Sequence, residues 1–311
     1  MTAFGDIAQT TIDGVAAGAL YALFALGFTM IFGVIRRANL AYGSSVMLGL
    51  YVATLAWMTF DISIVLCFAI ASAVAIATGL YVQVLCFPSR AADRQQPNDA
   101  HRLMVSVAAS FAVWMQLEEL ATLNMPAHLY PFPALAGDAV IELAGLSIRS
   151  DALIVLVAAL AVCAALYLTL YRTRFGLGIR ATVDLPRAAS VVGINVSGVF
   201  RKAFVIAAIV GTIGAFAACA TAEQLTPKLG MWLTLKAMLA MMVGGLGSLR
   251  GAVVAGVALG VLEAHVQRHF GPQLRDASTY LLLFAVLAWR AWRPGAATQF
   301  GVGVLGGRGV R

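Results

Sequence analysis

The sequence predicts an all-α membrane protein, a polytopic bundle of transmembrane helices. Of its 311 residues 61 % are hydrophobic and only 11 % are charged, too few polar residues to cover a soluble globule. Apolar runs near the length that crosses about 30 Å of hydrocarbon recur along nearly the whole chain. We therefore expect a single transmembrane domain over residues 1–294, followed by a disordered tail over 295–311.

The apolar runs predict eight or nine crossings, with boundaries good to about four residues. The expected spans are 15–35, 38–58, 62–86, 103–123, 152–171, 203–222, 233–248, 251–266 and 279–291. The count depends on residues 233–266, where the glycine-rich "VGGLGSLRG" interrupts a stretch too long for one helix and barely long enough for two.

The basic residues predict the orientation of the chain. With nine crossings and the N-terminus outside, Arg149, Lys228, Arg268 and Arg275 fall on outer segments and Lys236 lies near a membrane edge. The other 16 of the 21 Lys and Arg residues fall on cytoplasmic segments, as the positive-inside rule requires. The net charge of +7 therefore follows from topology, and nucleic acid is disfavoured as a partner. The N-terminus has no basic n-region or cleavage site, so no cleaved signal peptide is expected.

Glycine pairs in the apolar runs predict places where helices approach closely. Small residues let helix backbones touch in a membrane, although glycine is common in membrane helices in any case. The pairs are Gly14 and Gly18, Gly211 and Gly214, and Gly256 and Gly260.

The second apolar run begins with the polar stretch "NLAYGSS", which contains Asn39, Tyr42, Gly43 and Ser44. Polar groups are costly in hydrocarbon, so we expect this stretch to face protein or a water-filled cavity. The alternative is a polar helix start at the cytoplasmic interface. Two other polar segments are a cytoplasmic connector over 88–102 and an external loop over 124–150, whose prolines disfavour a helix.

The central cytoplasmic loop, residues 172–202, contains the polar stretch "RATVDLPRAASVVGIN". Asp184 can act as an N-cap, Pro186 sits in the first turn and Gly193 can end the helix. This predicts a helix of about two turns, too short to be stable alone, with a small apolar face formed by Ala188, Ala189 and Val192. It is either a docking element or a connector lying at the membrane surface.

Four stretches in this order resemble the permease subunit of the high-affinity branched-chain amino acid ABC importers. They are "GVAAGALYALFALGFTMIFGVI" followed by "NLAYGSSVMLGLYV", then "TRFGLGIRATVDLPRAASVVGIN" and "LKAMLAMMVGGLGSLRGAVVAGVALGVLEA". The similarity runs from about Gly14 to Trp289. It implies a multi-pass protein of the bacterial inner membrane, and the distribution of basic residues with nine crossings predicts a cytoplasmic C-terminus.

The resemblance also implies partners. It assigns the central loop as a coupling helix that seats in a cleft of cytoplasmic ABC ATPase subunits. The residues assigned to this contact are Arg180, Ala181, Asp184, Ala188, Ala189 and Gly193. A second permease subunit, the same or related, and an extracytoplasmic solute-binding protein complete the expected complex, with membrane lipids around it.

The resemblance places "NLAYGSS" on the translocation path. The family has His and Glu where this chain has Tyr42 and Ser44, so substrate identity is not implied by these residues. Lys236, in the family's "LKA" context, is assigned to the path or an interface, although a lysine there can also snorkel to the outer surface. The glycines Gly244, Gly245 and Gly247 predict a tight turn or broken helix beside the path, since irregular backbone is tolerated only where it is buried or lines water.

The sequence offers little for catalysis. None of its three lysines lies in a G-x-x-x-x-G-K-[ST] motif, so any ATP must be bound by partner subunits. Glu263, His265 and His269 do not form H-E-x-x-H, and the isolated cysteines, all in apolar runs, read as packing residues, so no metal, disulfide or cofactor is expected. The alternative to an importer subunit is a stand-alone channel or ion-coupled carrier, which the scarcity of acidic residues in the predicted spans disfavours.

Overall fold

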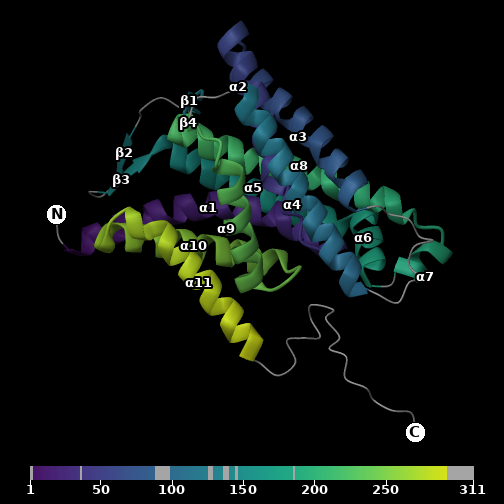
Figure 1. Cartoon of the computed structure of the whole chain (residues 1–311). Helices are drawn as coiled ribbons and strands as arrows, with labels where there is room; N and C mark the ends of the chain where they lie inside the picture. Colours follow the sequence, from purple (N-terminus) through teal and green to yellow (C-terminus); the bar gives the residue numbers. More distant parts are fainter. Residues whose placement is uncertain are drawn as a thin grey trace.

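The computed structural model describes residues 3–35, 37–87, 99–124, 129–135, 140–143, 146–184 and 186–292. These residues form eleven helices and four short strands (Figure 1). The predicted tail over 295–311 and most of the connector over 88–102 lie outside the described residues.

The helices follow the predicted apolar runs closely. They are α1 (Ala3–Ile35), α2 (Tyr42–Phe60), α3 (Ile64–Cys86), α4 (Asp99–Asn124), α5 (Ser150–Arg172), α6 (Arg174–Asp184), α7 (Pro186–Val191), α8 (Val196–Ala222), α9 (Leu229–Gly244), α10 (Leu249–Phe270) and α11 (Gln273–Trp292). Each predicted span corresponds to one helix, of which α9 is the shortest with 16 residues. Among the described residues six helices, α1, α2, α3, α5, α8 and α10, are long and apolar enough to cross a membrane.

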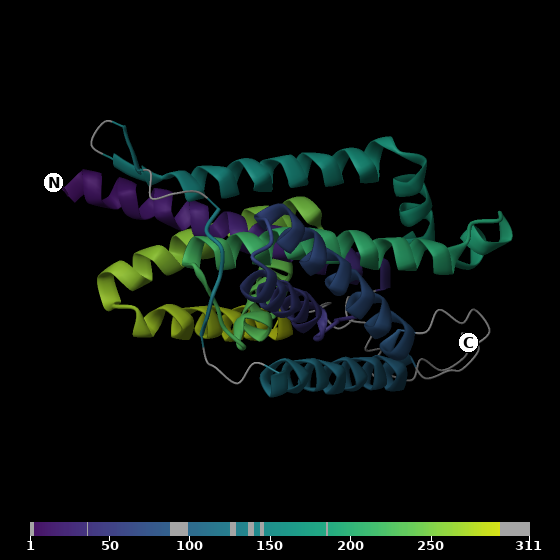
Figure 2. The ribbon, with the colours of Figure 1, turned by 90° about the horizontal axis from the view of Figure 1, so that it is seen from above.

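Helix α1 is the centre of the bundle. It packs against α10, α8, α9 and α5, and its sequence is apolar all round, as expected of a helix with neighbours on every side. Seen from above, α5 and α4 lie on opposite sides of the molecule (Figure 2). The N-terminal end of α1 and strands β2 and β3 lie at one end, and α6 and α7 lie at the other (Figures 1 and 2).

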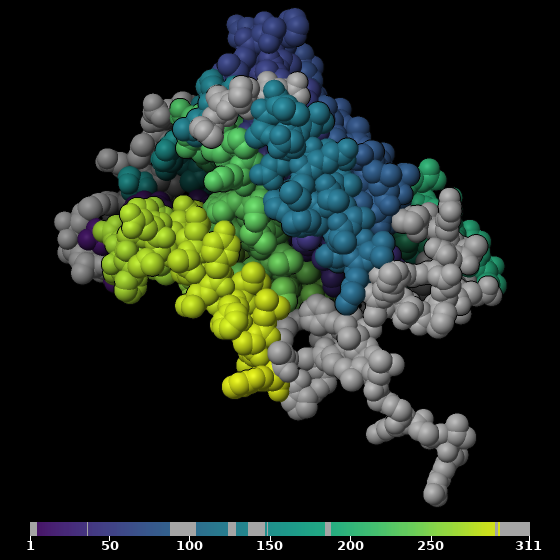
Figure 3. Space-filling model, viewed as in Figure 1, coloured from purple at the N-terminus to yellow at the C-terminus, as the bar shows by residue number. Residues whose placement is uncertain are grey.

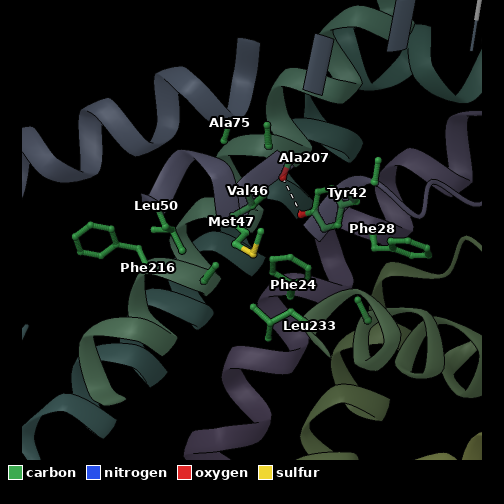
Figure 4. Packing of buried hydrophobic residues seen from close by; sticks show 14 of the residues in the cluster. Phe24, Phe28, Tyr42, Val46, Met47, Leu50, Ala75, Ala207, Phe216 and Leu233 are labelled. Atoms are coloured by element: carbon green, nitrogen blue, oxygen red, sulfur yellow. Dashed lines mark hydrogen bonds between the residues drawn. The ribbon is translucent and has the colours of Figure 1, made fainter. Parts of the chain in front are cut away.

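The core is formed where α1, α2, α8 and α9 meet (Figure 4). The ring of Tyr42, at the start of α2, lies 4.8 Å from that of Phe24 and 6.0 Å from that of Phe28, measured between centroids. Its hydroxyl donates a hydrogen bond to the carbonyl of Ala207 on α8 at 2.9 Å. The aromatic packing and the satisfied hydroxyl together fix the start of α2 against α1 and α8.

Four short strands were not predicted. Strand β1 (Tyr130–Pro131) pairs antiparallel with β4 (Gln224–Leu225), and β2 (Val140–Leu143) pairs antiparallel with β3 (Leu146–Arg149). Strands of two to four residues are too short to show an alternating pattern in sequence. The expectation of a purely α-helical chain was wrong in this detail, because the α4–α5 connection forms one strand pair within itself and one with the α8–α9 connection.

Two helices begin well before the predicted spans. Helix α1 starts at Ala3 rather than at residue 15, and its extension is held by Gln9, which exchanges two hydrogen bonds with the backbone of Ser147 at 2.8 and 3.0 Å. Helix α8 starts at Val196 rather than at 203, because Asn195 Oδ1 caps it by accepting from the Gly198 N–H at 2.9 Å. An apolar run marks only the part of a helix that lies in hydrocarbon.

The predicted tight turn between α9 and α10 is confirmed. Gly245 and Gly247 have φ angles of +101° and +79°, which a residue with a side chain rarely adopts. Ser248 Oγ then caps α10 by accepting from the Gly251 N–H at 3.2 Å. The apolar stretch over 233–266 is therefore two helices joined by a short turn.

Candidate functional site

A group of charged and aromatic side chains lies where α1, α9, α10 and α11 meet; Tyr21, Lys236, Glu263 and Thr279 are buried, Trp232 and Arg275 are half-buried, and Asp276 is exposed. We call it the charged cluster; its members are Tyr21, Trp232, Lys236, Glu263, Arg275, Asp276 and Thr279. It contains two cations and two carboxylates, so its formal charge is balanced.

Glu263 is the centre of the charged cluster. Both of its carboxylate oxygens lie 2.6 Å from Lys236 Nζ, and Oε2 also accepts from Arg275 Nε at 3.2 Å. The hydroxyl of Tyr21 donates to Oε2 at 2.8 Å, and the hydroxyl of Thr279 donates to Oε1. Charged and neutral donors thus satisfy a carboxylate that is only 1 % exposed.

Lys236 is held entirely inside the protein. Its side chain is 2 % exposed, and Nζ lies 3.8 Å from the ring centroid of Trp232 and 4.5 Å from that of Tyr21. Asp276 Oδ1 lies 3.8 Å from Nζ and accepts from Trp232 Nε1 at 3.1 Å. The snorkelling alternative was wrong, because Lys236 has a buried carboxylate partner and two aromatic faces that stabilise the cation in place.

The charged cluster lies well away from the α9–α10 turn. Tyr21 is twelve residues before Gly33, which packs beside Gly247 at that turn. At about 1.5 Å per residue Tyr21 is roughly 18 Å from the turn along α1. Ionisable groups buried among apolar helices are costly and commonly belong to a transport path.

A cavity of about 730 Å³ borders the charged cluster. Its polar and aromatic walls include Tyr21, Glu118, Lys228, Trp232, Arg275 and Asp276, and its apolar walls include Leu20, Met231, Leu233 and Leu235. Figure 3 shows α9 between α4 and α11, three of the helices that line this cavity. The cavity therefore offers both signs of charge beside an apolar surface, within the size range of small-molecule sites.

The polar stretch at the start of α2 is buried in protein. Asn39 Oδ1 accepts from the Ala41 N–H at 3.1 Å, and the Gly43 N–H donates to Thr234 Oγ1 on α9 at 3.0 Å. Within the described part of the chain, the fully buried hydroxyl of Ser44 has no hydrogen-bond partner. Tyr42 lies at the level of Phe24 and Phe28 of α1, so α2 begins inside the bundle rather than at its surface.

The three predicted path glycines lie far from the cavity along α9. A methyl group at Gly244 would overlap the backbone of Gly251, so this glycine lets α9 and α10 approach closely at their junction. Gly245 and Gly247 form the turn itself. Gly244, Gly245 and Gly247 thus lie apart from Lys236, although the sequence predicts all four residues on the translocation path.

The predicted coupling segment forms α6 and α7 at the opposite end of the molecule from β2 and β3 (Figures 1 and 2). Helix α7 has six residues, and Gly193 follows it with a φ of +86°. The N–H groups of Gly193 and Ile194 donate to the carbonyls of Ser190 and Ala189 at 3.2 and 3.0 Å. The predicted two-turn helix ended by Gly193 is confirmed.

Two details of this segment differ from the prediction. Asp184 is the last residue of α6, one position too early to cap α7. Ala189 is 3 % exposed and packs within the chain, whereas Val191 and Val192 are 87 % and 74 % exposed. The exposed apolar surface of this segment is therefore formed by Val191 and Val192 at the end of α7, and Ala189 is not part of it.

The other predicted coupling residues lie on α6 and α7. Ala188 is exposed and Ala181 is half-buried in α6. The Arg180 guanidinium lies 5.4 Å from the ring centroid of Tyr171, at the end of α5. This cation–π contact orients α6 against α5.

Sequence reasoning missed the partners of Lys236. In the sequence Glu263 stands out only beside His265 and His269, and the charge distribution predicts that Arg275 lies in an outer loop. A symmetric α9–α10 hairpin would bring Lys236 opposite residues near 257, not 263, so spacing alone does not reveal the pair. The usable signal was an acid and a base on neighbouring apolar runs, since such groups in a membrane pair with each other.

Comparison with known proteins agrees with this architecture. A family described as "Branched-chain amino acid transport system / permease component" matches residues 10–287. The chain is 28 % identical over 295 residues to the high-affinity branched-chain amino acid transport system permease protein BraD of Pseudomonas aeruginosa, covering 91 % of this chain and 93 % of the relative. It is also 28 % identical over 291 residues to LivH of Salmonella typhimurium and of Escherichia coli, covering 90 % of this chain and 92 % of each. The chain therefore belongs to the family of permease components of branched-chain amino acid transport systems.

Proposed function

We propose that this chain is the transmembrane subunit of an ATP-driven importer that moves branched-chain or related amino acids into a bacterial cell. The cavity beside the charged cluster is the observation that carries the proposal. An α-amino acid presents a carboxylate, an ammonium group and a side chain. In the cavity Lys228 and Arg275 can meet the carboxylate, Glu118 and Asp276 can meet the ammonium group, and the apolar wall can meet the side chain. A path needs only weak binding of this kind, because its cargo must leave again.

We propose that the path continues from this cavity between α2 and α9. Gly43 contacts Thr234, which lies between the cavity residues Leu233 and Leu235 on α9. The unpaired hydroxyl of Ser44 supports this route, because a buried hydroxyl without a partner is costly and gains one if water or cargo reaches it. This route passes the residues that the sequence predicts on the translocation path, which are Asn39, Tyr42, Gly43, Ser44 and Lys236.

We further propose nine crossings, with the N-terminus outside and the C-terminus in the cytoplasm. Helices α4, α9 and α11 pack against the six apolar helices and complete the count. This orientation places the cavity toward an extracytoplasmic binding protein and places α6 and α7 toward ATPase subunits. The complex would contain a second permease subunit and would alternate between outward-open and inward-open states.

Neutralising Glu118 should slow transport while leaving the fold intact. Glu118 lines the cavity from α4 and would interact with the ammonium group of the cargo, whereas the neighbouring Glu119 is exposed outside this cavity. We expect Glu118→Gln to lower the uptake rate by about tenfold, equivalent to about 1.4 kcal/mol, and Glu119→Gln to leave it unchanged. The measurement is uptake by proteoliposomes that contain the assembled complex, with the binding protein held constant. If both variants take up amino acid at the same rate, the cavity is not part of the translocation path.

Polar replacements at the tip of α7 should weaken the contact with the ATPase. Two exposed valines buried at a docking interface stabilise it by about 3 kcal/mol, so Val191→Ser with Val192→Ser should lower ATPase affinity by about 100-fold. Val65→Ser, on α3 and also 74 % exposed, is the matched control. ATPase co-purification and uptake are measured for both. Normal co-purification and uptake for the double variant would exclude the end of α7 as the coupling contact. The replacement Ala189→Trp would test only the packing of Ala189 within the chain.

The alternative is a stand-alone channel or ion-coupled carrier. A coupled carrier needs an acidic group that is free to bind its ion within the membrane. Two carboxylates are buried in the described spans: Glu263 is already paired with Lys236 and Arg275, and Asp151 with Arg149. This pairing favours the importer subunit.

A further inference from the structure

A second cavity, of about 760 Å³, lies at the end of the molecule that carries α6 and α7. We call it the basic cavity; Arg174, Phe175 and Gly178 line it from α6, and Asn195, Arg201 and Lys202 line it from the start of α8. None of the described residues that line it is acidic. Three cations therefore surround one hollow without a neutralising carboxylate in its walls.

The local structure fixes where these cations lie. Arg174 is the first residue of α6, and Arg201 and Lys202 lie in the second turn of α8. Asn195 caps α8 and so sets the direction of its first turns, and Lys202 Nζ lies 5.8 Å from the ring centroid of Phe175. All three cationic side chains are exposed, and among the described residues none of them forms an ion pair. The basic cavity is thus available to an anion from outside the chain.

An apolar groove continues from the basic cavity. This groove, of about 320 Å³, shares Phe175, Arg201 and Lys202 with it. Its remaining walls are Leu80 on α3 and Val205 and Ile206 on α8. Passing along α8 from residue 201 to residue 206, the walls change from cationic to aliphatic within about 8 Å.

This gradient matches the depth profile of a membrane. Helix α8 is one of the six helices able to span, and its cations lie within its first two turns, where headgroups lie. Val205 and Ile206 follow at the depth where acyl chains begin. A soluble protein partner could supply an acidic group to the cations, but it could not place an apolar segment alongside α3 and α8 below the headgroup level.

We propose that the basic cavity and the apolar groove together bind one anionic phospholipid. Its phosphate lies among Arg174, Arg201 and Lys202, and one acyl chain lies along Leu80, Val205 and Ile206. Basic hollows between membrane helices on the cytoplasmic side are suited to acidic headgroups. The bound lipid would connect α6 to α8 and α3, next to the segment proposed to contact the ATPase.

The test measures retention of phosphatidylglycerol by the full-length chain. The chain is placed in nanodiscs of phosphatidylcholine with a minority of phosphatidylglycerol, then released into detergent, and the retained lipid is counted by native mass spectrometry. We expect Arg201→Gln with Lys202→Gln to lower retention about tenfold or more. The matched control is Arg172→Gln with Arg250→Gln, which removes two exposed cations from outside the basic cavity and from outside α6. The control should retain phosphatidylglycerol as the unchanged chain does.

A second variant tests the apolar groove without changing charge. Val205→Phe should fill the groove and lower retention of phosphatidylglycerol several-fold. Thermal unfolding, followed with a thiol-reactive dye at the buried Cys67, Cys86 and Cys219, establishes that each variant is folded and should show the unchanged chain stabilised by phosphatidylglycerol but not by inorganic phosphate.

Three results would overturn the proposal. Equal loss of retention in the two double variants would mean general attraction to a charged surface. Equal stabilisation by inorganic phosphate would mean an anion site with no acyl chain. Full retention by Arg201→Gln with Lys202→Gln, together with loss of ATPase binding, would assign the basic cavity to the protein partner.

Discussion

Replacing Glu263 by glutamine should destabilise the protein more than any other single change in the charged cluster. The carboxylate accepts from Lys236, Arg275, Tyr21 and Thr279, so its loss leaves the half-buried Arg275 without a carboxylate and the buried Lys236 with only Asp276, which lies 3.8 Å from Nζ. Breaking a buried ion pair from one side costs about 3 to 5 kcal/mol, because an uncompensated charge remains. The measurement is the midpoint of thermal unfolding in nanodiscs, read from dye reaction with the buried cysteines.

Replacing Lys236, the partner of Glu263, should destabilise the protein less. Lys236→Met leaves Glu263 still paired with Arg275 and hydrogen-bonded to Tyr21, so the loss of stability should be smaller than for Glu263→Gln. The double variant should lose less than the sum of the two single losses, as expected for residues in contact. Glu119→Gln, at an exposed carboxylate on α4, is the control and should unfold as the unchanged chain does. Additive losses, or Lys236→Met being the worse variant, would contradict the central position of Glu263.

The helices could be predicted from the sequence because the membrane imposes their length. Every apolar run became a helix, and the glycine pair of α10 marks a place where two helices touch, since methyl groups at Gly256 and Gly260 would meet the backbones of Ala22 and Gly18. Hydropathy could not predict the extension of α1 to Ala3, which depends on the contact between Gln9 and Ser147, more than a hundred residues away. The pairing of β1 with β4 is equally non-local.

The candidate site was predicted in part. Lys236 could be identified because a lysine in an apolar run is unusual. Its partners could not be identified in this way. The position of Glu263 opposite Lys236 depends on how α10 packs against α9, and the spacing of residues in the sequence does not predict that packing. Likewise Ala189 and Val192 are both apolar, so the sequence alone does not distinguish them. The packing of α7 shows that Val192 is exposed and Ala189 is buried.

A methyl group at Gly18 should separate α1 from α10 and destabilise the bundle. The Cβ of Gly18→Ala would lie 2.7 Å from both Cα and O of Val257, backbone atoms that cannot move without moving α10. Gly260→Ala should act in the same way, since its Cβ would overlap the backbone of Gly18. Forced separation of a close contact costs about 1 to 3 kcal/mol. Uptake should fall as well, because Glu263 lies one turn beyond Gly260 on α10.

Gly33→Ala, in the same helix, separates this effect from helix propensity. Its Cβ would meet only Gly247 Cα at 3.8 Å, an ordinary contact. Both replacements in α1 gain the same preference of alanine for a helix, about 0.5 to 1 kcal/mol, so Gly33→Ala should be neutral or slightly stabilising. The comparison is the unfolding midpoint of the two variants in nanodiscs of one lipid composition. If Gly18→Ala unfolds at the same temperature as Gly33→Ala, α1 and α10 are not in backbone contact, and the close approach that brings Tyr21 to Glu263 must have another cause.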